Sequence, residues 1–243
     1  MNDSWPNRSD QPPPFRDRMH AGRVLAEQVV THLKDDKKEA PAQAVVLALP
    51  RGGVVVGQQI ADAINAPLDV LLVRKIGAPR QPELAIGAVV DTQPVPQAVW
   101  NEHLLQTVIL PDDYQQQELH RQIDLIRQQR SSYDRALAGH PRPDIMGKTA
   151  IIVDDGIATG ASIRAAIRGL RAAGTVRSTI LCVPVAPAEV VADLRLEVDH
   201  VICPFCPAHL RAVSLGYENF EQTTEAEVIA CLTQQRRAQD GRH

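Results

Sequence analysis

The sequence lacks a strong net charge and a long apolar run, and each absence excludes a class of function. The formal net charge of the 243 residues is −3, so the chain has no global basic field that would indicate nucleic acid or an anionic membrane as a partner. No apolar run approaches the roughly 20 residues that a membrane-spanning helix needs. Residues 1–14 lack the apolar stretch of a signal peptide. We therefore expect a cytoplasmic protein with no nucleic-acid partner and no membrane partner.

Cysteine is scarce, and the four present fit reduced thiols. The run from Cys203 to Cys206, followed by His209, superficially suggests a metal site. No second cysteine pair exists, and four ligands are not easily found. We interpret both residues as small apolar side chains near a strand end, and keep metal or redox chemistry as the lesser alternative. No protein ligand for a metal is firmly predicted.

The composition is that of a soluble globular protein, with 44% hydrophobic and 23% charged residues. The length suits one large α/β domain or two small ones. Residues 1–14 are polar and rich in proline and are expected to be disordered. We place one domain at 15–235 and a C-terminal tail at 236–243.

Periodicity predicts alternating strands and helices, which is typical of a mainly parallel sheet flanked by helices. Strands are expected at 44–49, 68–73, 84–90, 150–153, 178–185 and 199–203. Helices are expected at 15–33, 54–65, 111–137, 163–173 and 187–197, and a last helix follows the capping box from Thr224 to Glu227.

The stretch from Thr149 to Ser162 organises the chain. A buried strand ends in Asp154 and Asp155, and a loop with Gly156, Thr159, Gly160 and Ser162 then feeds a helix. Unpaired N–H groups at the start of a helix bind anions. The two carboxylates repel phosphate, but they accept hydrogen bonds from sugar hydroxyls or help to hold hydrated Mg²⁺. A ribose 5-phosphate has the chemistry that suits both halves.

Two further turns offer positive charge or free N–H groups. Arg51, Gly52 and Gly53 follow the first strand, where adjacent glycines expose backbone N–H groups. Arg74 and Lys75 follow the next strand. Carboxyl ends of parallel strands meet at one edge of a sheet, so the three loops are expected to converge on one phosphorylated ligand.

The run Val-Asp-Asp-Gly-Ile-Ala-Thr-Gly-Ala-Ser, at 153–162, resembles the phosphoribosyl-pyrophosphate (PRPP) loop of the type I phosphoribosyltransferases. The blocks at 15–18, 49–53, 73–75, 82–88, 183–187 and 217–222 resemble a bacterial subgroup of uncharacterised predicted phosphoribosyltransferases. The resemblance implies the type I phosphoribosyltransferase fold, with a central mainly parallel sheet and a small hood subdomain. It also implies a pentosyltransferase of nucleotide and nucleoside metabolism that uses PRPP, Mg²⁺ and a small-molecule acceptor.

The resemblance assigns roles to individual residues. The residues expected to bind PRPP are Asp154, Asp155, Gly156, Ala158, Thr159, Gly160, Ala161 and Ser162. Those expected to bind pyrophosphate are Arg51, Gly52, Gly53, Arg74 and Lys75. Asp154, Asp155 and Arg51 are expected to be catalytic, and Mg²⁺ is expected to be held through PRPP near the two acids.

The acceptor side is less clearly marked in the sequence. Three of the chain's few aromatic residues fall near 203–222, the segment that we expect to form the hood over the acceptor, with Tyr217 and Phe220 as candidate contacts. A flexible loop that closes over the reaction is expected somewhere in 77–96. The helix at 111–137 is a candidate element of a homodimer.

Ala158 stands where enzymes that act on 6-oxopurines carry an acid, which argues against hypoxanthine or guanine as the acceptor. The alternative to an enzyme is a catalytically silent regulatory protein that binds PRPP or a nucleotide, because a fold does not fix a function.

Overall fold

The computed structural model describes residues 13–35, 43–137 and 140–240. Within them, five parallel strands form the main sheet, in the order β2-β1-β6-β7-β8. These strands are β1 (Ala44–Ala48), β2 (Leu68–Val70), β6 (Thr149–Val153), β7 (Ser178–Cys182) and β8 (His200–Ile202). The expected mainly parallel sheet flanked by helices is confirmed. Residues 1–12 of the predicted N-terminal tail lie outside the described residues.

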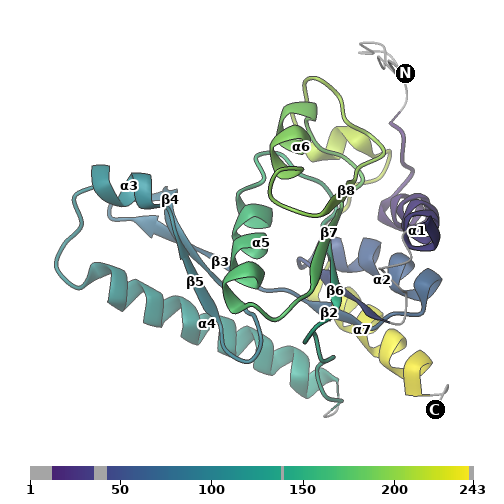
Figure 1. The fold of residues 1–243 in the computed structure, drawn as a ribbon, viewed down its shortest axis with the longest axis horizontal. Coiled ribbons are helices and arrows are strands. Elements are labelled where there is room, and N and C mark those ends of the chain that lie inside the picture. The colour runs from purple at the N-terminus through teal and green to yellow at the C-terminus, as the bar shows by residue number, and fades with distance from the viewer. Residues whose placement is uncertain (1–12, 36–42, 138–139, 241–243) are drawn as a thin grey trace.

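Helices cover both faces of the main sheet (Figure 1). On one face lie α1 (Arg18–Asp35), α2 (Gly52–Ile64) and α7 (Glu225–Asp240); on the other lie α5 (Ala161–Ala173) and α6 (Ala188–Leu194). Strand β1 is buried along its whole length, and its side chains alternate between the two cores: Val46 packs in the core beside α1 and α2, whereas Val45 packs in the core beside α5. In the described chain, no helix has both the length and the apolar character to cross a membrane.

Helix α5 follows the predicted pattern closely. Its apolar stripe, Ile163, Ala166, Ile167 and Leu170, is buried. Gly174 ends the helix with φ 61°, and its N–H bonds to the carbonyl of Arg171. A left-handed residue at this position favours glycine, because other side chains are strained there. The sequence pattern therefore predicts both the buried face of α5 and its end.

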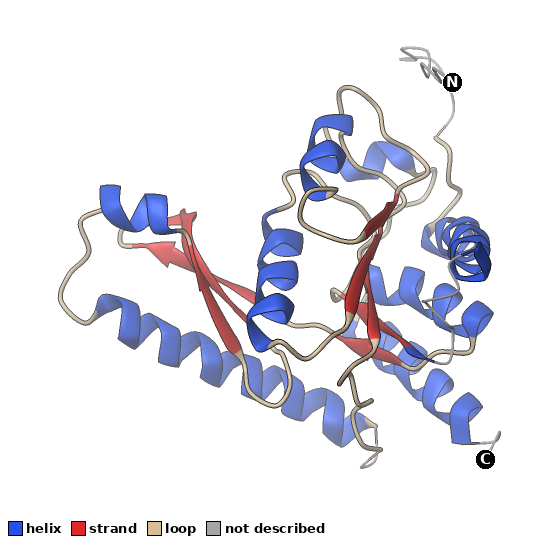
Figure 2. Cartoon of the chain, in the orientation of Figure 1, coloured by secondary structure: helices blue, strands red, loops and turns tan. Residues whose placement is uncertain are grey.

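A second unit projects from one side of the main sheet, and we call residues 73–136 the arm (Figure 2). It contains the antiparallel sheet of β3 (Val73–Ala78), β4 (Gln81–Val90) and β5 (Gln97–Trp100), followed by α3 (Glu102–Thr107) and α4 (Tyr114–Ala136). The predicted strand at 68–73 is wrong in its extent, because β2 ends at Val70 and β3 starts a new sheet. Most of 77–96, where we expected a flexible loop, is paired in β3 and β4.

A buried ion network fixes the arm to the main sheet. Arg130 of α4 donates to Asp91 at 2.7 Å, to Asp69 at 2.9 Å and to the carbonyl of Val70 at 2.6 Å. Arg142 pairs with the same two carboxylates. Asp69 is fully buried, so these partners are needed to offset the loss of its hydration. The network joins the carboxyl end of β2 to the end of β4 and to α4.

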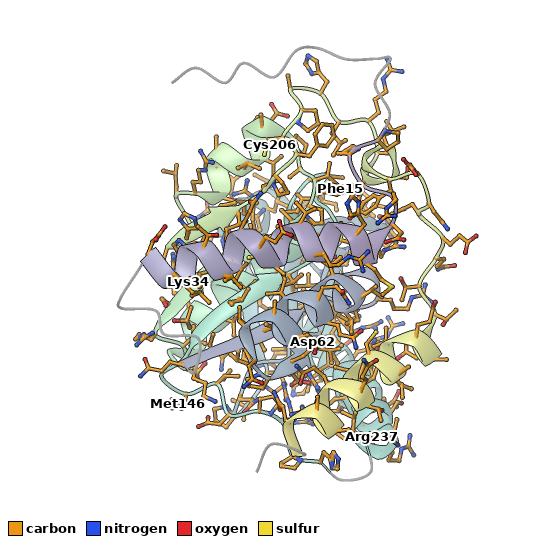
Figure 3. All side chains as sticks on the ribbon, turned by 90° about the vertical axis from the view of Figure 1, so that its right-hand side faces the viewer. Phe15, Lys34, Asp62, Met146, Cys206 and Arg237 are labelled. Atoms are coloured by element: carbon orange, nitrogen blue, oxygen red, sulfur yellow. The ribbon has the colours of Figure 1, made fainter. Side chains whose placement is uncertain are left out.

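We keep the name hood for the segment 203–222, where the hood was predicted. It contains a 3₁₀ turn at Val213–Gly216 and two isolated bridges, Phe15 with Tyr217 and Val185 with Phe205. Figure 3 shows Phe15 and Cys206 at one end of the molecule, with Met146 and Arg237 at the opposite end. The segment that precedes α1 therefore lies beside the hood, although the two are almost the whole chain apart in sequence.

Several predicted limits differ from the structure. Phe15 precedes α1 instead of opening it, and β7, α6 and β8 are each shorter than expected. Helix α7 runs to Asp240, so residues 236–240, which we assigned to a tail, are helical. Its capping box is confirmed: the Thr224 N–H donates to Glu227 at 2.6 Å, and the Glu227 N–H donates back to the Thr224 hydroxyl at 3.2 Å.

Candidate active site

The carboxyl ends of β1, β2 and β6 meet around one cavity of about 280 Å³. Its lining residues come from these strand ends, from β3, from α4 and from the start of α5: Leu49, Pro50, Leu71, Leu72, Val73, Arg74, Gln129, Asp154 and Ser162. Ligands of open α/β sheets bind at this edge. Two of the three predicted loops therefore supply residues to the cavity wall together with a polar side chain of the arm.

The acidic pair forms the centre of the site. The N–H of Asp155 donates to the Asp154 carboxylate at 2.8 Å. Burial and the adjacent charge of Asp155 raise the pKa of Asp154 well above its ordinary value, and Arg18 partly opposes them. The protein thus holds a carboxylate whose charge is poorly compensated. Such a group favours a ligand that brings hydroxyl donors or a cation.

The glycine turn after β1 lies against this pair. Arg51 is the residue before α2, its peptide bond to Pro50 is cis, and Gly52 and Gly53 open the helix. A Cβ atom at Gly53 would lie 2.8 Å from the Val153 carbonyl and 2.9 Å from the Cα atom of Asp154. Any larger side chain at Gly53 would push the turn after β1 away from the loop after β6. The glycines therefore bring the free N–H groups of α2 next to the carboxylates.

The loop from Gly156 to Ser162 leads directly into α5. Gly160 precedes the helix with φ 78°, a backbone conformation that favours glycine. Ala158, Thr159, Ala161 and Ser162 are exposed, so both hydroxyls are accessible to a ligand. The first N–H groups of α5 have no partner within the helix. The arrangement has the donors and the polarity of an anion site.

The three basic side chains that were predicted to bind pyrophosphate lie in different environments. Arg74 lines the cavity, and its Nε donates to Gln122 of α4 at 2.9 Å. Arg51 is exposed beside the glycine turn. Lys75 is on the adjacent position of β3 and pairs with Glu83 at 2.7 Å, with half of its side chain exposed. Successive strand residues point to opposite faces, so the structure brings Arg74 to the cavity and Lys75 to the solvent side.

Arg18 belongs to the site, although we did not predict it. Its Nε donates to Asp155 Oδ2 at 2.7 Å, and its guanidinium lies 3.9 Å from the centre of the Phe220 ring. Arg18 falls in the block 15–18 that carries the family resemblance, but its sequence context assigned it no role, because its partner is 137 positions away in sequence. Gln129, which also lines the cavity, was missed because the helix at 111–137 was expected to be an element of a homodimer and not a wall of the site.

The two hood aromatics have different environments. Tyr217 is buried between Phe15 and Phe220, and its hydroxyl donates to the backbone carbonyl of Asp155. This burial, with the nearby charge of Asp155, raises the pKa of the Tyr217 phenol. Phe220 is only half-buried. Tyr217 therefore supports the acidic loop, and Phe220 is the more exposed of the two hood rings.

The cysteine motif lies in the turn that opens the hood. The Cys206 thiol donates to the Cys203 carbonyl at 3.2 Å. All four cysteines are free thiols. Within the part of the chain that the structure describes, no group of three or more His, Cys, Asp or Glu residues could hold a metal ion. Locally, the hydrogen bond from Cys206 to Cys203 closes the turn.

The chain matches a known protein family and curated relatives. The phosphoribosyl transferase domain family matches residues 18–204. A curated protein of Mycobacterium tuberculosis (strain ATCC 25618 / H37Rv) named "Putative phosphoribosyl transferase Rv0571c" is 40% identical over 218 residues. The alignment covers 90% of this chain and 46% of that protein, so the chain spans about half the length of the curated relatives it matches.

A solved structure is similar along almost the whole chain. The crystal structure of TT1426 from Thermus thermophilus shares 36% of its sequence with this chain and superposes with a TM-score of 0.75. The match covers 90% of this chain and 98% of TT1426. The two chains therefore share their fold along nearly their whole length.

Proposed function

The chain belongs to the phosphoribosyl transferase domain family, and from that premise we propose that it transfers a 5-phosphoribosyl group from PRPP to a nitrogen base and releases pyrophosphate. One observation carries the proposal: the acidic pair, the start of α5 and the glycine turn before α2 surround the same strand ends. PRPP has the matching parts, since it carries a diol, a 5′-phosphate and a diphosphate on one ribose.

Each part of the substrate has an expected contact. Asp154 and Asp155 accept hydrogen bonds from the ribose hydroxyls. The N–H groups and hydroxyls between Gly156 and Ser162 bind the 5′-phosphate. The N–H groups of Gly52 and Gly53, with Arg51 and Arg74, bind the diphosphate. Lys75 would bind the diphosphate only after its ion pair with Glu83 had broken.

The residues present fit Mg²⁺ held mainly through the substrate. Mg²⁺ prefers oxygen ligands and keeps several waters, and it is commonly bound through one or two carboxylates plus substrate phosphates. Asp154 and Asp155 supply carboxylate oxygens beside the expected diphosphate. When bound, the ion would template the diphosphate and hydroxyls and offset negative charge.

The protein contributes position and electrostatics instead of a covalent nucleophile. As the bond between ribose C1 and the diphosphate lengthens, negative charge grows on the leaving group and positive charge on C1. Arg51, Arg74 and the α2 N–H groups face the negative charge. The carboxylates of Asp154 and Asp155, when ionised, favour the positive charge. The base nitrogen then attacks C1 from the acceptor side, where both reactants are held in place.

The acceptor is expected to be a flat base that stacks on Phe220. Guanine and hypoxanthine are expected to be poor acceptors, because Ala158 offers no carboxylate to assist their ring nitrogen. Two further expectations go with the function. The thiols stay reduced if the protein acts in the cytoplasm, and a homodimer is the expected assembly.

Pyrophosphate release from PRPP and Mg²⁺ with a panel of purine and pyrimidine bases tests the proposal. Release that depends on one base establishes the transfer and names the acceptor. Efficient turnover of guanine would refute the argument from Ala158, whereas a gain of guanine turnover in Ala158→Asp would support it. Tight PRPP binding without release for any base would favour the regulatory alternative.

A further inference from the structure

Arg18 connects the acidic pair to the hood through three contacts. Its Nε donates to Asp155 Oδ2 at 2.7 Å, and its Nη1 donates to the backbone carbonyl of Glu221 at 2.5 Å. Its guanidinium lies over the Phe220 ring, 3.9 Å from the centroid. Only 12% of the Arg18 side chain and 18% of the Asp155 side chain are exposed. A partly buried ion pair of this kind is screened less by salt than a surface pair.

The backbone around Arg18 is joined to the same part of the hood. The N–H of Phe15 donates to the Gly216 carbonyl at 3.2 Å, and the Glu218 N–H donates to the Phe15 carbonyl at 2.8 Å. The Asn219 N–H donates to the Arg16 carbonyl at 2.8 Å. Residues 15–18 and 216–221 therefore form one paired unit, and Arg18 is where that unit touches the carboxylates.

A second contact links the unit to the acidic loop. The Tyr217 hydroxyl donates to the backbone carbonyl of Asp155, while Arg18 binds its side chain. Both the backbone and the carboxylate of Asp155 are thus held by the unit. A carboxylate has about four lone-pair positions, so Asp155 can keep Arg18 and still accept a ribose hydroxyl. Arg18 need not leave when a sugar binds.

We propose that Arg18 is a positioning residue that couples the ribose site to the acceptor side: it fixes Asp155 toward the sugar and holds Phe220 and the 218–221 backbone as the acceptor wall. The inference rests on the proposed function, since it names the acceptor side of the same site. One edge of the Arg18 guanidinium binds the carboxylate of Asp155, which is expected to contact the ribose. The other edge and the flat face hold the hood. Occupancy of the sugar site then orders the acceptor wall.

Arg18→Lys tests the coupling, because lysine keeps the charge but lacks the fork and the flat face. In the ligand-free variant, the amides of residues 218–221 should exchange hydrogen at least about tenfold faster than in the wild type. In the wild type, PRPP with Mg²⁺ should slow the exchange of these amides, and in Arg18→Lys that response should be lost. Arg23→Lys, at an exposed position of the same helix, is the matched control and should behave as the wild type.

Phe220→Leu gives a second measurement that keeps the ion pair with Asp155. It should weaken the response of the 218–221 amides while PRPP affinity changes less than about threefold. An equal response to PRPP in Arg18→Lys and the wild type would overturn the coupling. Failure of the wild type to bind PRPP would contradict the proposed function. Unchanged hydrogen exchange of the 218–221 amides in ligand-free Arg18→Lys would contradict the proposal that Arg18 holds the hood.

Discussion

Gly52 lies directly against the carboxylate of Asp155. A Cβ atom at Gly52 would come 1.9 Å from Asp155 Oδ2 and 2.7 Å from the Nε of Arg18. Two motifs that lie far apart in the sequence are therefore in contact, with no room for a methyl group. The turn that follows β1 and the acids that follow β6 form one site, because β1 and β6 are adjacent parallel strands in register.

This contact predicts that Gly52→Ala lowers the affinity for PRPP by at least about tenfold, a loss of roughly 1.4 kcal/mol. The methyl group must displace Asp155 or Arg18, which removes the geometry of the sugar site. Gly57→Ala, in the same helix, is the control, because its Cβ would meet only core side chains at 3.1 Å or more. It should leave affinity unchanged, whatever its effect on the melting temperature (Tm). Calorimetric titration of both variants with PRPP measures the two affinities, and equal affinities would contradict the account.

Asp154→Asn should make the ligand-free protein more stable at neutral pH while impairing function. The raised pKa of Asp154 means that the folded state holds a proton that the unfolded state has released. Stability is therefore lost as pH rises from the ordinary range of an aspartate through the folded-state pKa. Asparagine is neutral throughout and keeps the oxygen that accepts the Asp155 N–H.

Thermal unfolding at two pH values measures this effect. At about pH 8, Asp154→Asn should have a higher Tm than the wild type, by about 2–4 °C for each kcal/mol that it adds to the free energy of unfolding. This difference in Tm should shrink near pH 4. Asp155→Asn should have the opposite sign, because it breaks the ion pair with Arg18. A pH-independent difference for Asp154→Asn would show that the charge of Asp154 is not the cause.

Arg74 and Lys75 are adjacent, and the structure predicts unequal roles. Arg74→Ala should reduce pyrophosphate release by about 10- to 100-fold, because Arg74 lines the cavity and would face the charge that develops on the leaving group. Lys75→Ala should change it less than about threefold, because its partner is Glu83 in solvent. Steady-state kinetics on the two variants compare them directly. A larger effect at Lys75 would mean that the loaded site rearranges β3.

Arg130 should be essential for stability. Arg130→Ala leaves Asp69 and Asp91 buried with fewer partners. Breaking a buried pair in this way lowers the free energy of unfolding by about 3–5 kcal/mol. Arg127→Ala, one turn earlier on α4, removes only an exposed pair with Asp124 and should cost less than about 1 kcal/mol. Chemical denaturation of both variants gives the two free energies of unfolding. Similar values would show that the arm is not fixed through Arg130.

The elements that could be predicted are those with local causes. Ala150 to Val153 is a continuous apolar run, α5 has a regular stripe and a glycine end, and the Thr224 box caps α7; each depends on residues a few positions apart. The contact between Gly52 and Asp155 followed less directly, from the rule that parallel strand ends share an edge. The family resemblance rested on these same local motifs.

What could not be predicted depends on distant contacts. The strand at 84–90 and the long helix of the arm were predicted, but the separate sheet was missed, because periodicity alone does not distinguish β3, which pairs with β4, from a continuation of β2. The opposite directions of Arg74 and Lys75 follow from the register of that sheet. Arg18 was missed because its role exists only once the chain has brought residues 155 and 220–221 beside it.

The central claim is that the acidic pair and the loop that follows it bind PRPP, and calorimetric titration with PRPP and Mg²⁺ tests it most directly. The wild type should bind one PRPP per chain, and the double variant Asp154→Asn, Asp155→Asn should stay folded and lose most of that affinity. Absence of heat for the wild type at millimolar PRPP, or equal affinity of the double variant, would contradict the account.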